Sequence, residues 1–110
     1  MVVVPARGEV LFRLLGSEEI KERDFLNNVA KGRPPLGSEP FVARLGLSMY
    51  EHPDQAVLKA RRYPVALAAV TLVAGSGLML AKTYGVGHYT VWGDPDVLLD
   101  HAQLAGHIPR

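Results

Sequence analysis

Short hydrophobic runs that end at glycine or proline dominate this sequence, and they predict more strands than helices. In the first clear run, Phe12 and Leu14 share one face by alternation, and Arg13 lies on the other. An arginine on an otherwise apolar face is typical either of a binding residue or of an edge strand whose guanidinium reaches water. Candidate strands lie at residues 2–4, 9–15, 46–50, 65–73, 78–83 and 89–92.

Capping residues and prolines predict three helices, over residues 17–31, 51–63 and 94–104. Ser17 is followed by two glutamates, which suit the first turn of a helix. In the second helix, Lys59 is expected on the solvated outer face. Residues 33–40 contain three prolines and are expected to form a loop. This order of elements predicts a single α+β domain over residues 1–110.

Residues 65–81 are almost free of charge, and their length is at the lower limit for a membrane-spanning helix. Two glycines and a serine in the middle of the segment, at 75–77, favour a turn between two strands instead. The chain has 48% hydrophobic residues, which is enough for a globular core. Its net charge of +1 does not favour non-specific binding to nucleic acid. Without cysteine, disulfides and thiolate chemistry are excluded, and we expect a cytoplasmic protein, or one delivered into the cytoplasm of a target cell, with no membrane partner.

Three short motifs each place a polar residue in or at the mouth of a predicted strand. Arg13 lies in the strand at 9–15, Ser48 lies in residues 46–50 (Gly-Leu-Ser-Met-Tyr), and His88 precedes the strand at 89–92 within residues 87–95 (Gly-His-Tyr-Thr-Val-Trp-Gly-Asp-Pro). A guanidinium can pair with a phosphate, and a small hydroxyl leaves room for a planar ring. A neutral imidazole can accept a proton.

In this order, the three motifs resemble those of the ADP-ribosyltransferase superfamily, which includes the poly(ADP-ribose) polymerases and many bacterial toxins. The resemblance implies a split, mixed or antiparallel sheet of about six strands with two to three short helices, and NAD in the cleft between its halves. It implies transfer of ADP-ribose from NAD to a macromolecular acceptor, or hydrolysis of NAD. By position, it assigns catalysis to Arg13, Ser48 and His88, and NAD contacts to Arg13, Leu14, Gly46, Leu47, Ser48 and Tyr50.

The resemblance also implies that residues 84–87, the loop before the third motif, contact the acceptor. If the chain is a toxin of this family, a neutralising immunity protein is an expected partner. His88 departs from the family pattern, since it stands where the family has a glutamate that supports the positive charge developing on the ribose. A substitute carboxylate could come from Glu51, Asp94 or Asp96.

Two alternatives to a transferase therefore stay open. One is a binding module with the same fold and an inactive site, and the other is a toxin of a different fold that acts on RNA. The remaining histidines, at 52, 101 and 107, match no common metal-ligand spacing, so no metal site is expected.

Overall fold

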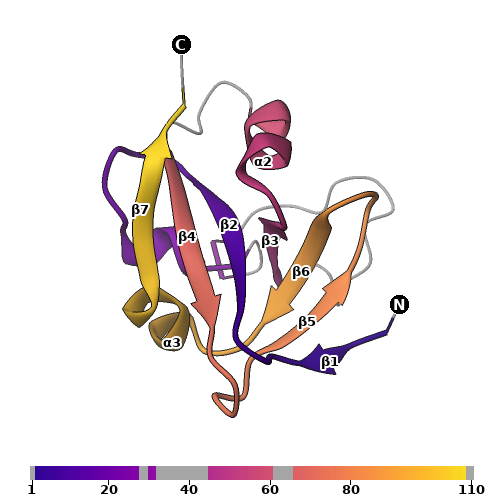
Figure 1. Ribbon diagram of the computed structural model, residues 1–110. Helices are drawn as coiled ribbons and strands as arrows, with labels where there is room; N and C mark the ends of the chain where they lie inside the picture. Colours follow the sequence, from indigo (N-terminus) through magenta and orange to yellow (C-terminus); the bar gives the residue numbers. More distant parts are fainter. Residues whose placement is uncertain (1, 28–29, 32–44, 61–65, 109–110) are drawn as a thin grey trace.

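A single antiparallel sheet organises the chain in the computed structural model, which describes residues 2–27, 30–31, 45–60 and 66–108 (Figure 1). Its seven strands run in the order β1-β5-β6-β3-β2-β4-β7, and every neighbouring pair is antiparallel. The predicted α+β class is confirmed, with one more strand than expected. The strands are β1 (Val4–Pro5), β2 (Glu9–Leu15), β3 (Leu47–Tyr50), β4 (Ala66–Leu72), β5 (Met79–Lys82), β6 (His88–Trp92) and β7 (Ala102–His107).

Two short α-helices accompany the sheet in the described part of the chain, and a proline begins each of them. Helix α2 (Pro53–Lys59) follows β3, and the Gln55 side chain accepts a hydrogen bond from the His52 backbone N–H at 3.3 Å. Helix α3 (Pro95–Asp100) follows β6, and the Asp94 carboxylate caps it by accepting from the Asp96 N–H at 2.9 Å. The predicted starts of both helices are therefore close to the observed ones.

The helix predicted over residues 17–31 is wrong in its described part, which contains only the 3₁₀ turn η1 (Glu22–Phe25). The Asp24 carboxylate explains the difference, because it accepts hydrogen bonds from the backbone N–H groups of Lys21, at 2.8 Å, and Gly16, at 3.4 Å. Such a side chain offers the backbone an alternative to helical hydrogen bonds. Residues 33–40, predicted as a loop, lie outside the described residues.

The last predicted helix is also too long, because the chain leaves α3 at Asp100 and continues as β7. Strand β7 pairs with β4 from Ala66–His107 to Val70–Ala102 and so occupies the edge of β4 that β2 leaves open. The turn predicted from the glycines and serine at residues 75–77 is confirmed, since residues 74–77 connect β4 to β5. No helix among the described residues is long and apolar enough to cross a membrane.

Strand pairing is uneven across the centre of the sheet. Strand β2 pairs with β4 along its whole length, from Glu9–Leu72 to Leu15–Ala66. On its other side, β2 shares only the pair Phe12–Tyr50 with β3. We call this sparsely paired junction the β2–β3 seam. The three strands that carry the sequence motifs, β6, β3 and β2, are consecutive in the sheet, and the last two border the seam.

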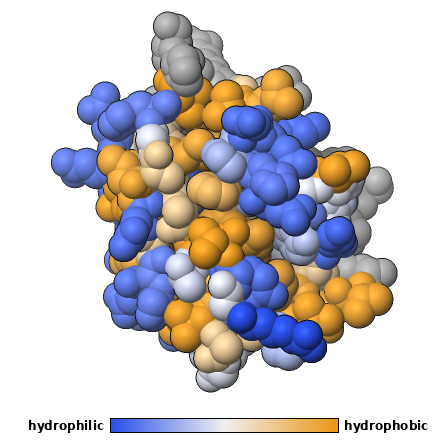
Figure 2. Space-filling model, viewed as in Figure 1, coloured by the Kyte–Doolittle hydropathy of each residue, from blue (hydrophilic) through white to orange (hydrophobic). Residues whose placement is uncertain are grey.

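The sheet buries side chains on both faces, as the alternation in β2 predicts. The larger cluster contains Leu11 and Leu15 of β2 and packs against Phe25 of η1 and Leu98 of α3. The smaller cluster gathers Tyr50, Ala56 and Leu67, with Phe12 and Leu14 partly buried against it. On the face seen in Figure 2, hydrophobic residues run down the middle of the molecule between hydrophilic margins. The smaller cluster places α2 over the end of β3, which positions the candidate site.

Candidate functional site

Arg13 joins β2 to β3 at the seam. Its Nε donates to the carbonyl of Asp24 at 3.0 Å, and its Nη1 donates to the carbonyl of Ser48 at 2.8 Å. The Ser48 carbonyl lies beyond the single β2–β3 pair, so the guanidinium takes the place of a ladder hydrogen bond. The alternative that Arg13 belongs to an edge strand is wrong, because β2 lies between β3 and β4.

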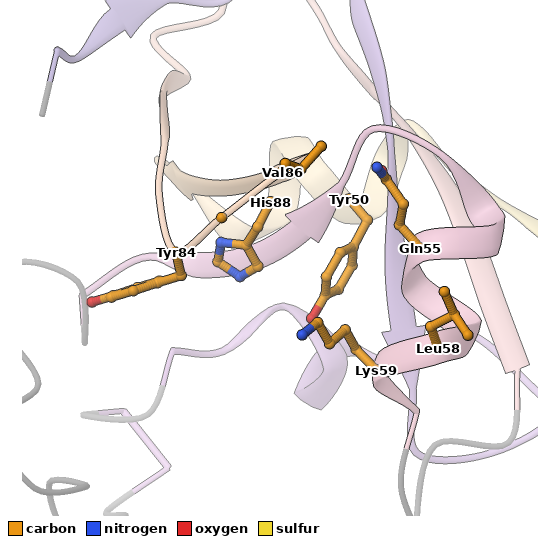
Figure 3. Close-up of a pocket in the computed structure, with 8 residues that line it drawn as sticks. Tyr50, Gln55, Leu58, Lys59, Tyr84, Val86 and His88 are labelled. Carbon is orange, nitrogen blue, oxygen red and sulfur yellow. The ribbon is translucent and has the colours of Figure 1, made fainter.

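A pocket of about 330 Å³ lies where the start of β6, the end of β3 and the C-terminal turn of α2 meet (Figure 3). Its volume is at the lower end of the range of roughly 300–1,000 Å³ that is usual for small-molecule sites. We call it the His88 pocket. It is lined by Tyr50, Gln55, Leu58, Lys59, Tyr84, Gly85, Val86 and His88.

His88 is held in one orientation by Thr83. Its Nδ1 lies 2.9 Å from both the carbonyl and the Oγ1 of Thr83, and that Oγ1 is 2.7 Å from the Oγ1 of Thr90. Because a carbonyl can only accept, Nδ1 carries the proton and Nε2 keeps a lone pair. In Figure 3 the second ring nitrogen points into the space between Tyr84 and Tyr50.

The surroundings of His88 keep its ring neutral. The side chain is 8% exposed, and burial lowers the pKa of His88 below its usual value. The hydrogen bond to the Thr83 carbonyl partly offsets this effect, whereas the nearby Lys59 ammonium adds to the lowering. Near pH 7, Nε2 is therefore a hydrogen-bond acceptor and a potential general base.

Two tyrosines flank the imidazole of His88. The Tyr50 and His88 rings are 5.2 Å apart and nearly perpendicular, at 79°, and the Tyr84 ring lies 5.5 Å away at 64°. Burial raises the pKa of the Tyr50 phenol, and the Arg13 guanidinium partly offsets the increase. Tyr50 therefore lies near both Arg13 and His88. It belongs at once to the β2–β3 seam, where it pairs with Phe12, and to the lining of the His88 pocket.

Gly87 lets the β5–β6 connection approach α2. It has a φ of 73°, and a Cβ at this position would overlap the Gln55 side chain. The Gly87 carbonyl also accepts a hydrogen bond from the Glu51 N–H at 2.8 Å. These contacts join the end of β3 to the start of β6, which holds Tyr50 beside His88.

Of the residues predicted from the motifs, only His88 and Tyr50 line the pocket. Ser48 is exposed on β3, and its carbonyl is joined to Arg13. Leu14 is half-buried in the smaller cluster, and Leu47 is buried in the larger one on the other face of the sheet. Gly46 lies against the side chains of Thr90 and Trp92.

The three candidate carboxylates do not line the pocket either. Glu51 follows β3 directly, but its side chain is exposed. Asp94 and Asp96 lie at the start of α3, beyond the end of β6 opposite His88. Within the described residues, no group of three or more His, Cys, Asp or Glu side chains is arranged to hold a metal ion.

Sequence reasoning missed Lys59, Gln55 and Leu58 as parts of the site. Helical periodicity assigned Lys59 to a solvated face, and the side chain is indeed exposed, yet it also lines the pocket. The position of Lys59 in the sequence could have indicated its place in the site, because a short helix that directly follows a motif strand folds back over the end of that strand. The loop at 84–87, singled out from the sequence, supplies Tyr84, Gly85 and Val86.

The fold and the site thus define an α+β domain with a histidine in an aromatic-walled pocket at the ends of two neighbouring strands of an antiparallel sheet. Comparison with protein-family models, with curated proteins and with solved structures finds no match to this chain.

Proposed function

We propose that this chain is an ADP-ribosyltransferase-like domain that binds NAD and breaks its nicotinamide–ribose bond. The observation that carries the proposal is the adjacency of β6, β3 and β2, which bear the three motif residues although they lie far apart in the sequence. The resemblance implies a sheet that divides at its centre, and the β2–β3 seam has one partner pair. The antiparallel strand order thus brings Tyr50 and His88 together on one face of the sheet, and it places Arg13 on the neighbouring strand β2, where alternation starts its side chain from the other face.

The chemistry of the pocket suits this reaction. Tyr50 and Tyr84 offer aromatic walls for a planar ring, and His88 offers a neutral nitrogen beside them. In the proposed step, the bond between C1′ of the ribose and the nicotinamide nitrogen breaks, and nicotinamide leaves with the electron pair. An oxygen of water or of an acceptor hydroxyl bonds to C1′, and its proton passes to Nε2 of His88.

The loop and helix at the pocket mouth suit an acceptor of large size. Val86 is 91% exposed and Leu58 is 84% exposed, and both line the pocket. Apolar side chains grouped around a pocket mouth are typical of a contact surface for a macromolecule. We therefore propose that the acceptor contacts Val86 and Leu58 while its nucleophile reaches His88.

One observation favours the second candidate, a module that binds NAD without cleaving it. No carboxylate belongs to the described lining of the pocket. That lining therefore supplies no negative charge to stabilise the positive charge that develops on the ribose during cleavage. Binding needs no such charge, whereas rapid cleavage does.

Incubation of the purified chain with NAD separates the two candidates. The transferase proposal expects an increase in melting temperature with NAD and release of nicotinamide, measured by chromatography. His88→Gln should abolish release while leaving the chain folded. His101→Gln is the matched control, since the His101 side chain is exposed, does not line the pocket, and places its Nδ1 2.9 Å from the Val97 carbonyl in the preceding helix turn.

Each outcome decides between the candidates. Release of nicotinamide that is lost in His88→Gln and retained in His101→Gln supports the transferase. Stabilisation by NAD without release supports the binding module. If millimolar NAD is neither bound nor consumed, both candidates are wrong.

A further inference from the structure

Lys59 brings a positive charge to the His88 pocket, and the described residues that line the pocket include no negative charge to match it. It lies in the last turn of α2 and lines the pocket, and in Figure 3 its side chain extends toward the Tyr50 hydroxyl. No described carboxylate forms an ion pair with it within 4.0 Å. The described lining of the pocket holds a lysine and a histidine but no acid, so a bound anion would complete the charge balance of the site.

The second polar group of the pocket, the His88 imidazole, needs a hydrogen-bond donor rather than an anion as its partner. Because Nδ1 of His88 donates to the Thr83 carbonyl, Nε2 accepts a hydrogen bond and does not donate one. A matching ligand therefore carries an anionic oxygen for Lys59 and, near it, a hydroxyl for Nε2. A phosphorylated ribose has both groups on one sugar, whereas a simple carboxylate ion supplies the anionic oxygen for Lys59 and no hydroxyl for Nε2.

We infer that Lys59 is a specificity-determining residue that binds the phosphate of a ribose phosphate unit. In the bound state Nε2 of His88 accepts a hydrogen bond from a hydroxyl of the same unit, and in the proposed transfer it exchanges this bond for the proton of the attacking oxygen. The inference rests on the proposed function in one respect, since NAD contains such a unit. It goes further by assigning the phosphate contact to a residue outside the three motifs. The phosphate could belong to a pyrophosphate, as in ADP-ribose, or to a terminal phosphate, as in ribose 5-phosphate.

Titration of the full chain with four probes tests the inference. ADP-ribose and ribose 5-phosphate carry the phosphate, and adenosine and ribose are the corresponding ligands without it. Binding is followed by isothermal titration calorimetry on the wild type and on Lys59→Met, Lys59→Arg and Lys82→Met. Lys82 is the matched control because it is an exposed lysine of β5 that lines a different hollow at the β1–β5 edge.

Lys59→Met is expected to raise Kd for the better-bound phosphorylated probe at least about tenfold, because a charge-assisted contact is lost. Lys59→Arg should restore most of the affinity, and Lys82→Met should leave Kd unchanged. Melting temperatures close to that of the wild type would show that the substitutions act on binding, as expected for an exposed side chain. A pyrophosphate site binds ADP-ribose more tightly than ribose 5-phosphate, and a terminal-phosphate site shows the reverse order.

Failure of this inference differs from failure of the proposed function. If NAD is bound or cleaved but Lys59→Met binds both phosphorylated probes as well as the wild type does, the inference is wrong and the function stands. If NAD is neither bound nor cleaved, yet Lys59-dependent binding of ribose 5-phosphate is measured, the function is wrong and the inference stands. Binding of an acidic peptide in preference to all four probes would also overturn the inference.

Discussion

Arg13→Met tests whether one side chain closes the β2–β3 seam. The substitution keeps an unbranched apolar stem but removes the hydrogen bonds to the carbonyls of Asp24 and Ser48. Since β2 and β3 share only one partner pair, no neighbouring ladder bond compensates for the loss. We therefore expect the seam to loosen and the free energy of unfolding to fall.

The size of the effect follows from the two bonds. A hydrogen bond with a charged partner contributes about 1.5–3 kcal/mol. The bond to Ser48 is exposed and the bond to Asp24 is partly buried, so water would solvate the released carbonyls, and we take about 1–1.5 kcal/mol for each. The expected loss is about 2–3 kcal/mol, which at a urea dependence of about 1.5 kcal/mol per molar lowers the unfolding midpoint by roughly 1.3–2 M.

Urea unfolding followed by the fluorescence of Trp92 measures this midpoint. Arg7→Met is the matched control, because Arg7 is exposed and a surface substitution of this kind changes stability by at most about 0.5 kcal/mol. A midpoint for Arg13→Met equal to that of Arg7→Met would refute the idea that the guanidinium holds the two strands together. An unchanged midpoint with weaker NAD binding would instead assign Arg13 to the ligand alone.

Three further outcomes follow from the structure. Gly87→Ala should lower the melting temperature more than Gly85→Ala, because both residues have positive φ but only a Cβ at Gly87 meets the Gln55 side chain; equal losses in a thermal scan would contradict this. The lowered pKa of His88 means that the unfolded chain takes up a proton more readily than the folded one, so wild-type stability should be full above about pH 6.5 and should decline as the pH falls through the lowered value. Urea unfolding across this interval should show a smaller pH slope for His88→Gln. Asp94→Ala should cost about 0.5–2 kcal/mol through loss of the α3 cap, and its unfolding midpoint checks this.

Local sequence signals predicted the strands well. Alternation located β2 and the two faces of its side chains, and a glycine-rich turn separated β4 from β5. The signals failed in two places. The Asp24 carboxylate bonds to the nearby backbone N–H groups of Lys21 and Gly16 and competes with a helix, a local effect that hydrophobic periodicity does not report. Strand β7 forms because β4, which is distant in sequence, has a second edge to pair, and this leaves no pattern in the β7 segment itself.

The candidate site was predictable only in part for the same reason. His88 and Tyr50 stood out because each lies at a strand end in a motif that contains glycine. His88 directly follows Gly87, and Tyr50 ends the short stretch that begins at Gly46. Lys59 had no such marker, since a lysine on a short helix is usually solvated. Its place in the pocket depends on how α2 folds back over β3, which the Gln55–Gly87 packing fixes.

The sequence by itself determined the class of fold, the start of most elements and the identity of the residues that can do chemistry. These features depend on side-chain periodicity and on local backbone preferences, which act over a few residues. The tertiary structure decided which of those residues meet. It joined Arg13 to the Ser48 carbonyl, set His88 between two tyrosines and turned Lys59 toward them. Strand order and register cause these meetings, and both are selected by burial of the whole sheet rather than by any one segment.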